Sequence, residues 1–173
     1  TRLIVDDDID VLRHACWALF HLLDGLEYED VRSVMRNPSF VKNILNHAIH
    51  LLQLSTFPLE LPVLNTLYLI TKADKAGGID AIIRCEGIAA ISKILSTDHE
   101  DHRILAYKVM CNIISGSSDR LQAAIDCEMF PQLFELLSQT QDKYALQVIL
   151  EATGAANLVQ SRYLVNSGFL TTD

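Results

Sequence analysis

DRLQAAIDCEMFPQLFELLSQTQDKYALQVILEATGAA, residues 119–156, is the stretch that decides the fold. Its apolar residues recur three and four positions apart, which is the spacing of one face of an α-helix. The pattern predicts helices over 119–127, 130–138 and 142–156. Pro131 falls in the first turn of the second helix, where its missing N–H is tolerated. This stretch is therefore predicted to form three consecutive helices, and strands are not indicated.

The same pattern recurs along the chain with an offset of about 42 residues, within the period of roughly 20 to 50 residues that is typical of stacked repeats. The match continues beyond one helix, since Ala106 aligns with Val148 and Met110 with Ala152. The chain is thus predicted to be a helical solenoid. The clearest aligned pairs are Ile83 with Ile125, Ile88 with Phe130, Ile91 with Leu133, Ile94 with Leu136 and Leu95 with Leu137.

Two details refine this repeat. Met35 and Ile83 occupy equivalent places but lie farther apart than this offset, so about six extra residues enter around 43–55, where we expect a lengthened second helix. Gly25 and Gly116 stand where third helices end, and both are predicted to form the left-handed cap that glycine adopts at little cost.

Three helices per repeat is the armadillo pattern, so the predicted fold is all-α: a right-handed superhelical solenoid of armadillo repeats, each about 42 residues long. Residues 1–173 are predicted to form a single armadillo-repeat segment of about four repeats with both ends incomplete, because the chain closes inside a first helix at 162–169. Repeat arrays need polar caps at their ends. We therefore expect a piece of a longer protein, or a chain whose ends are trimmed or covered by a partner.

Composition limits the partners and the location. Half of the residues are hydrophobic, which predicts a folded core, and the formal net charge of −8 disfavours nucleic acid and mildly favours basic partners. The longest apolar run, 15–20, is far shorter than the roughly 18 residues that span a bilayer. The acidic residues 1–10 do not resemble a secretory signal, which favours an intracellular location.

Catalytic and metal sites are not indicated. Two histidine pairs, His47 with His50 and His99 with His102, have a spacing found among zinc ligands but lack a convincing third ligand. No phosphate-binding glycine loop or nucleophile motif occurs. We expect no enzyme, no catalytic residue, no metal and no cofactor. The four cysteines, Cys16, Cys85, Cys111 and Cys127, form no CxxC pair and are predicted to be reduced packing residues in helices.

Three segments carry a family resemblance: HACWALFHLLDG at 14–25, YKVMCNIISG at 107–116 and QAAIDCEMFPQLFELL at 122–137. Together they resemble the importin-α family, in particular the carboxy-terminal half of its repeats. The resemblance implies a nuclear import adaptor, present in cytoplasm and nucleus, that holds the basic localisation signal of a cargo protein. Other transport factors would contact parts of the protein outside this chain, and no nucleic acid or membrane partner is implied.

In that family the concave groove is lined by a tryptophan and, four residues later, an asparagine on successive third helices. Residues i and i+4 share one helix face, and indole rings attract cationic side chains. The resemblance therefore implies that the peptide-binding residues are Trp17, His21, Asp24, Asn65, Lys108 and Asn112. The aligned pairs are Trp17 with His21, Asn65 with Leu69, Lys108 with Asn112 and Leu150 with Gly154.

A second interpretation stays open. No aligned pair contains both tryptophan and asparagine, and Lys108 places a positive charge where a signal's lysine would lie. Trp17 would then be a bulky packing residue, and the chain an armadillo scaffold that has lost signal binding and serves as a structural or regulatory interaction platform. The early acids Asp6, Asp7, Asp8 and Asp10 could attract basic cargo, but capping of a helix start is favoured. The same is expected of Asp98, Glu100 and Asp101.

Overall fold

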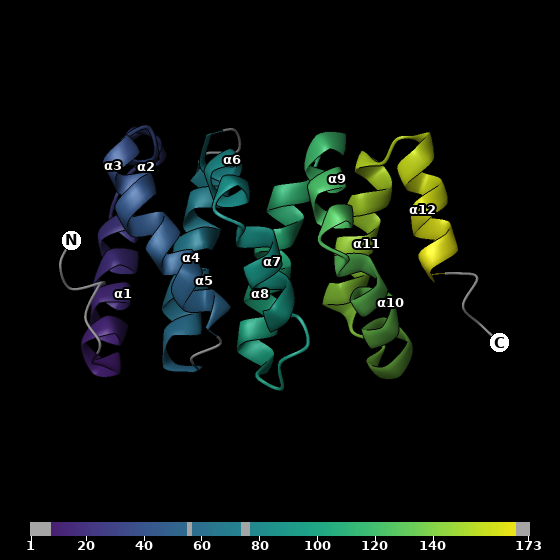
Figure 1. The fold of residues 1–173 in the computed structure, drawn as a ribbon, viewed down its shortest axis with the longest axis horizontal. Helices are drawn as coiled ribbons and strands as arrows, with labels where there is room; N and C mark the ends of the chain where they lie inside the picture. The colour runs from purple at the N-terminus through teal and green to yellow at the C-terminus, as the bar shows by residue number, and fades with distance from the viewer. Residues whose placement is uncertain (1–7, 55–56, 74–76, 169–173) are drawn as a thin grey trace.

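The computed structural model describes residues 8–54, 57–73 and 77–168, and within these ranges every regular element is a helix. The helices stand side by side in one elongated row, with α1 and α12 at opposite ends (Figure 1). First helices are α2 (Tyr28–Met35), α6 (Gly77–Arg84), α9 (Ser118–Asp126) and α12 (Leu158–Gly168). Second helices are α3 (Pro38–Phe40) with η2 (Val41–Leu45) and α4 (Asn46–Gln53), then α7 (Gly87–Ile94) and α10 (Met129–Thr140). Third helices are α1 (Ile9–Asp24), α5 (Phe57–Ala73), α8 (Glu100–Ile114) and α11 (Lys143–Ala155).

The three helices predicted within 119–156 are confirmed, with bounds shifted by at most two residues. Local capping explains where they begin. The Ser117 side chain accepts a hydrogen bond from the backbone N–H of Arg120 at the start of α9, and Asp142 accepts from Tyr144 at the start of α11. Asp8 likewise accepts from Asp10 and caps α1, as favoured for the early acids, whereas Asp6 and Asp7 lie outside the described residues. Such side-chain oxygens satisfy N–H groups that have no partner within the helix.

The extra residues of the first full repeat extend its second helix, as predicted. This helix runs without interruption from Pro38 to Gln53, through a π-helical segment at Val41–Leu45. A π-segment holds an additional residue per turn, so it absorbs an insertion while the helix continues on both sides.

One glycine prediction is wrong. Gly116 has φ of +70° and ends α8 in the left-handed region as expected, but Gly25 has φ of −78°. The backbone N–H of Gly25 donates to the carbonyl of His21 and that of Leu26 donates to the carbonyl of Leu23, so the chain leaves α1 through a right-handed turn that any residue can adopt. The position of a glycine was a correct signal for the helix end but not for the backbone conformation.

Neighbouring repeats are joined by hydrogen bonds whose sequence separation is close to the repeat period. His102 Nδ1 donates to Glu60 Oε2 at 2.8 Å, and Asn112 Nδ2 donates to Thr71 Oγ1 at 3.1 Å; both bonds link α5 to α8. Gln160 Nε2 donates to the carbonyl of Ser118 at 2.8 Å and links α9 to α12. Since each partner sits at nearly the same position in its repeat, the stacking places equivalent residues side by side.

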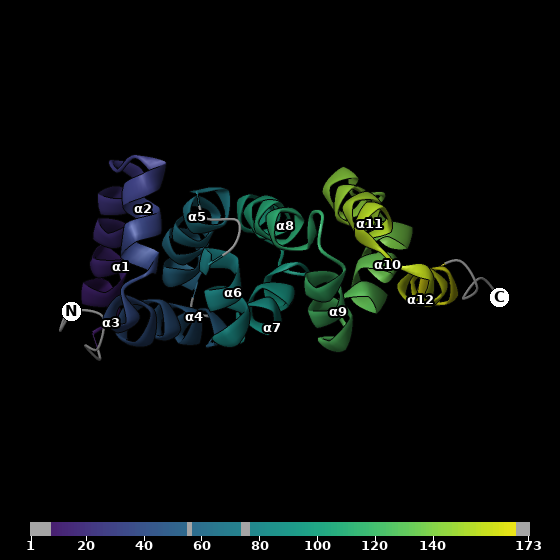
Figure 2. The same ribbon diagram turned by 90° about the horizontal axis from the view of Figure 1, so that it is seen from above.

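Third helices pack against third helices, and the core lies between them and the other two rows. Figure 2 shows α5, α8 and α11 along one side of the solenoid and α4 and α7 along the other. The core is made of leucine, isoleucine, valine and alanine with Tyr107 and Phe130 among its largest members. No helix within the described residues has the length and apolarity needed to cross a membrane.

The cysteine prediction is only partly correct. Cys16 is buried, and burial raises its pKa to about 11. Cys127 is exposed because it follows the last residue of α9, and Cys85, one repeat earlier, follows α6 in the same way. These two lie at the joints between first and second helices rather than inside a helix.

Candidate functional site

A hollow of about 210 Å³ opens on the side formed by the third helices. Its walls come from three successive repeats, so it exists only because the repeats stack. Tyr68 of α5 forms one wall and Tyr144 with Gln147 of α11 the opposite one. The floor belongs to α8, which contributes Tyr107, Lys108, Cys111 and Asn112.

Two of the tyrosines pack together across the joint between α8 and α11. The rings of Tyr107 and Tyr144 lie 6.4 Å apart and are nearly parallel, with 11° between their planes. Tyr107 is 1% exposed, and its hydroxyl donates a hydrogen bond to the carbonyl of Leu95 at 3.3 Å. Burial, with the nearby charge of Asp142, raises the pKa of Tyr107 to about 12. This phenol is therefore a neutral, rigid part of the wall at physiological pH.

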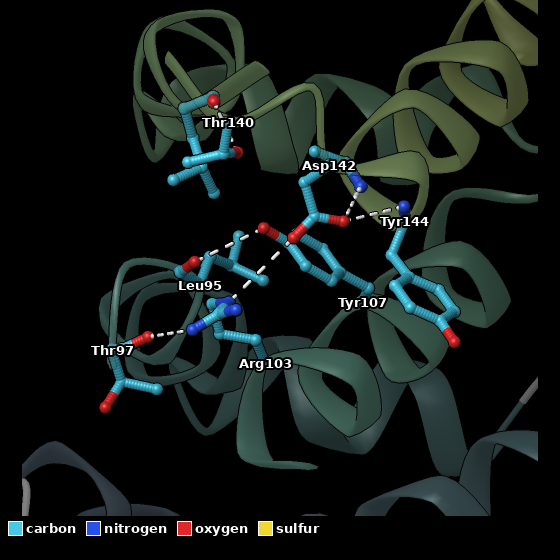
Figure 3. Close-up of polar contacts among 9 residues, drawn as sticks. Leu95, Thr97, Arg103, Tyr107, Thr140, Asp142 and Tyr144 are labelled. Carbon is cyan, nitrogen blue, oxygen red and sulfur yellow. Dashed lines mark hydrogen bonds and ion pairs between the residues drawn. The ribbon is translucent and has the colours of Figure 1, made fainter. Parts of the chain in front are cut away.

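Polar contacts beneath the rings hold α8 and α11 in position (Figure 3). Asp142 accepts from the backbone N–H of Tyr144 at 2.8 Å, and its other oxygen lies 3.9 Å from Nε of Arg103. Arg103 in turn donates to the carbonyl of Thr97 at 2.7 Å. One carboxylate thus begins α11 and ties it to α8, which sets how closely the two tyrosines approach.

One lysine side chain lines the hollow, and two more lie beside its tyrosines. Lys108 is exposed and belongs to its lining. The Nζ atom of Lys143 lies 4.9 Å from the centre of the Tyr144 ring, and that of Lys72 lies 6.0 Å from the centre of the Tyr68 ring. Lys72 also lies over Tyr28, and a hydrogen bond with that tyrosine raises the pKa of the ammonium. The rings of Tyr68 and Tyr144 thus already make cation–π contacts with lysine side chains of the same chain.

The remaining floor residues are an amide and a thiol. The side-chain amide of Asn112 donates one hydrogen bond, to the hydroxyl of Thr71. An asparagine amide has two N–H donors and one carbonyl oxygen as acceptor. Burial, followed by the negative charge of Glu151, raises the pKa of Cys111 to about 11. This cysteine is therefore an apolar wall residue rather than a reactive thiolate.

The six residues predicted to bind a peptide fall into three places. Lys108 and Asn112 lie together in the hollow. Asn65 is half-buried on α5, and its amide donates to the carbonyl of Leu61 one turn back in its own helix. Trp17, His21 and Asp24 lie together on α1, two third helices away from α8.

The α1 group has its own geometry. Trp17 is half-buried and stacks on His21, with ring centres 5.7 Å apart, and it meets Phe20 edge to face at 5.8 Å. Asp24 is exposed, and its charge acts on Lys72 across the joint to α5. The tryptophan therefore both packs within its helix and keeps part of its surface in solvent, between the two roles that the sequence left open.

Five lining residues were missed by the sequence analysis: Tyr68, Tyr107, Cys111, Tyr144 and Gln147. We call the first residue of each aligned pair the ladder position, and Tyr68 and Cys111 each lie three positions after one, Asn65 and Lys108. This regular offset could have indicated them. Tyr107 and Tyr144 are closer together in sequence than one repeat period, so alignment by that period does not pair them. They meet because their rings pack against each other across the joint between α8 and α11, a contact that only the packed structure shows.

Two larger hollows lie elsewhere. One of about 520 Å³ is lined mainly by α10, together with the joint between α7 and α8 and with Arg103 and Asp142, and one of about 620 Å³ is lined by α2, η2 and α6. Neither is lined by three consecutive third helices. Within the described residues no group of three histidine, cysteine or acidic side chains could hold a metal ion.

The whole chain is similar to solved armadillo structures. It superposes on one designed armadillo repeat protein with a TM-score of 0.80 at 19% identity, covering 98% of this chain and 69% of that one. It superposes on another, in complex with the peptide (KR)4, with a TM-score of 0.78 at 18% identity and the same coverage. It spans 66% and 42% of two engineered proteins that it also matches. No family model and no curated protein matches the sequence. The chain is an armadillo-repeat solenoid.

Proposed function

We propose that this chain is a protein-interaction module that holds an extended segment of another protein along the side formed by α5, α8 and α11. The observation that carries the proposal is the hollow whose walls come from three successive third helices. An extended segment rises about 3.3 Å per residue, and third helices pack about 8 to 10 Å apart, so each repeat serves two or three residues. One bound segment can thus contact all three helices at once.

The chemistry of the hollow suits such a segment. Tyrosine rings offer flat apolar surface with a polar edge, as at many protein interfaces. Asn112 and Gln147 carry amides, which can donate to and accept from a peptide backbone. Because the Tyr107 hydroxyl is bonded to Leu95 and its ring packs against Tyr144, these two rings need little ordering on binding.

Two finer versions of this function differ in the charge of the bound segment. The first is a nuclear import adaptor in cytoplasm and nucleus that binds a basic localisation signal. The exposed Asp24, on the same helix as Trp17, supports it, as does the similarity to a designed protein in complex with (KR)4. The second is a structural or regulatory platform that binds another kind of segment, and the lysine in the hollow favours it.

The general function is tested by selecting binding peptides from a random library on the whole chain. The selected peptides are then measured by fluorescence anisotropy against Asn112→Ala, and against Gln132→Ala as the control. Gln132 is an exposed residue of α10, away from the hollow. We expect saturable binding that Asn112→Ala weakens and Gln132→Ala leaves unchanged. Binding that survives Asn112→Ala and crosslinks to second helices would contradict the proposed surface.

A further inference from the structure

Positive charge is concentrated at the hollow although the chain as a whole is acidic. The formal net charge is −8 and the chain has six lysines, of which Lys108 lines the hollow while Lys72 and Lys143 lie beside the rings of its lining residues Tyr68 and Tyr144. Each comes from a different third helix, and all three are exposed. The concentration therefore results from the stacking of repeats and is invisible in the composition.

Three acids act on residues at or beside the hollow, and none of them is among its lining residues. Glu151 acts on Cys111, and Asp24 acts on Lys72 from α1. Asp142 acts on Tyr107 but caps α11 and lies beside Arg103. Among the described residues that line the hollow, Lys108 alone carries a charge, so the lining itself is positive.

On this basis we propose that the segment held in the hollow is acidic, with glutamate or aspartate side chains that meet Lys72, Lys108 and Lys143 in turn. The proposal rests on the proposed function and specifies its partner. A basic segment would have to bring its cations against these lysines, which costs energy in a shared groove. An acidic segment gains three charge-assisted contacts instead.

The positions of the lysines also set the spacing of the acids. Asn65, Lys108 and Leu150 are equivalent residues in the repeat alignment. Lys72 lies seven residues after Asn65 on its helix, and Lys143 lies seven residues before Leu150 on its own. Seven residues of helix rise about 10 Å, and the helices lie about 10 Å apart, so successive lysines are about 14 Å apart along a diagonal. An extended chain covers that distance in about four residues.

Apolar side chains between the acids complete the expected segment. Leu146 and Leu150 of α11 are 44% and 60% exposed, and Leu150 occupies the ladder position of its repeat. Large apolar side chains left in solvent beside an aromatic hollow are typical of a docking surface. We therefore expect leucine or an aromatic residue between acids placed every fourth residue.

The test uses three fluorescein-labelled peptides that share leucine, tyrosine and serine at the intervening places. Every fourth residue is glutamate in the first, lysine in the second and glutamine in the third. Anisotropy titrations with the whole chain are run at low and at physiological salt. We expect the glutamate peptide to bind most tightly and to weaken as salt rises, because exposed charge pairs are screened.

Charge reversal locates the contact. Lys108→Glu should weaken the glutamate peptide by about tenfold or more and improve the lysine peptide. Lys42→Glu, at an exposed lysine in η2, makes the same change of charge on the second-helix side and should have no such effect. Circular dichroism confirms that both variants remain folded.

The outcomes separate the two proposals. If the lysine peptide binds more tightly than the glutamate peptide, or if Lys42→Glu and Lys108→Glu act alike, the acidic segment is wrong and groove binding stands. The proposed function itself is wrong if two results occur together. None of the three peptides binds, and Asn112→Ala does not weaken the binding of any peptide selected from the random library.

Discussion

The buried pair between Glu60 and His102 offers a sharp test of how the third helices are held together. Nδ1 of His102 donates to Oε2 of Glu60 at 2.8 Å, and both side chains are only 7% exposed. Glu60 lies in the first turn of α5, where the helix dipole stabilises its negative charge. His102 lies on α8, so the bond crosses the joint beneath the proposed binding surface.

The perturbation is a double-mutant cycle of Glu60→Met, His102→Leu and the combination. His102→Leu takes a donor away from a buried carboxylate, which costs about 3 to 5 kcal/mol. For a chain of this size that loss lowers Tm by about 10 °C. The double variant replaces both polar groups with apolar ones of similar size, so it should recover most of the loss and lie within about 1 to 2 kcal/mol of the original.

The assay is urea unfolding followed by far-ultraviolet circular dichroism and by fluorescence. Trp17 is the single tryptophan and reports on α1 alone, so comparing the two signals shows whether the repeats unfold together. His50→Leu, an exposed histidine on α4, is the control and should change the free energy of unfolding by about 0.5 kcal/mol or less. If the single losses simply add in the double variant, the two residues are not coupled and the reasoning is refuted.

Three further predictions concern caps, pH and the repeat joint. Gly116→Ala should destabilise the protein by about 1 kcal/mol, because Gly116 has φ of +70°. Gly25→Ala should be neutral or slightly stabilising, because Gly25 has φ of −78°. Equal losses of stability in thermal unfolding would contradict these backbone conformations. Tyr107 has its pKa raised from 10 to about 12, so the unfolded state loses this proton first and stability falls by up to about 3 kcal/mol between about pH 10 and 12. Tyr107→Phe should flatten that part of the pH profile in urea titrations, and an unchanged slope would show that the phenol does not cause it. Gln160→Ala removes bonds to Ser118 and to the start of α12 and should cost about 1 to 2 kcal/mol; hydrogen exchange should quicken in α12 before α5, and uniform quickening would contradict a local role.

Much of the architecture could be predicted from local patterns. Apolar spacing, Pro131 and the offset between repeats were sufficient to place α9, α10 and α11 and to expect a lengthened second helix before α5. These features depend on residues close in sequence, where helix periodicity and capping act. The conformation of Gly25 was not predictable in this way, because the right-handed turn depends on which carbonyls the N–H groups of Gly25 and Leu26 reach.

The composition of the candidate site was decided by tertiary structure. Lys108 and Asn112 could be selected by the resemblance, since they are four residues apart on one helix. Tyr107 and Tyr144 do not follow the repeat period, and their rings meet only because α8 packs against α11. The gathering of Lys72, Lys108 and Lys143 likewise depends on how three helices stack. The sequence by itself determined a helical solenoid and its register, because both follow from local periodicity. The wall, floor and charge of its hollow depend on side chains from different repeats, far apart along the chain, and only packing brings these together.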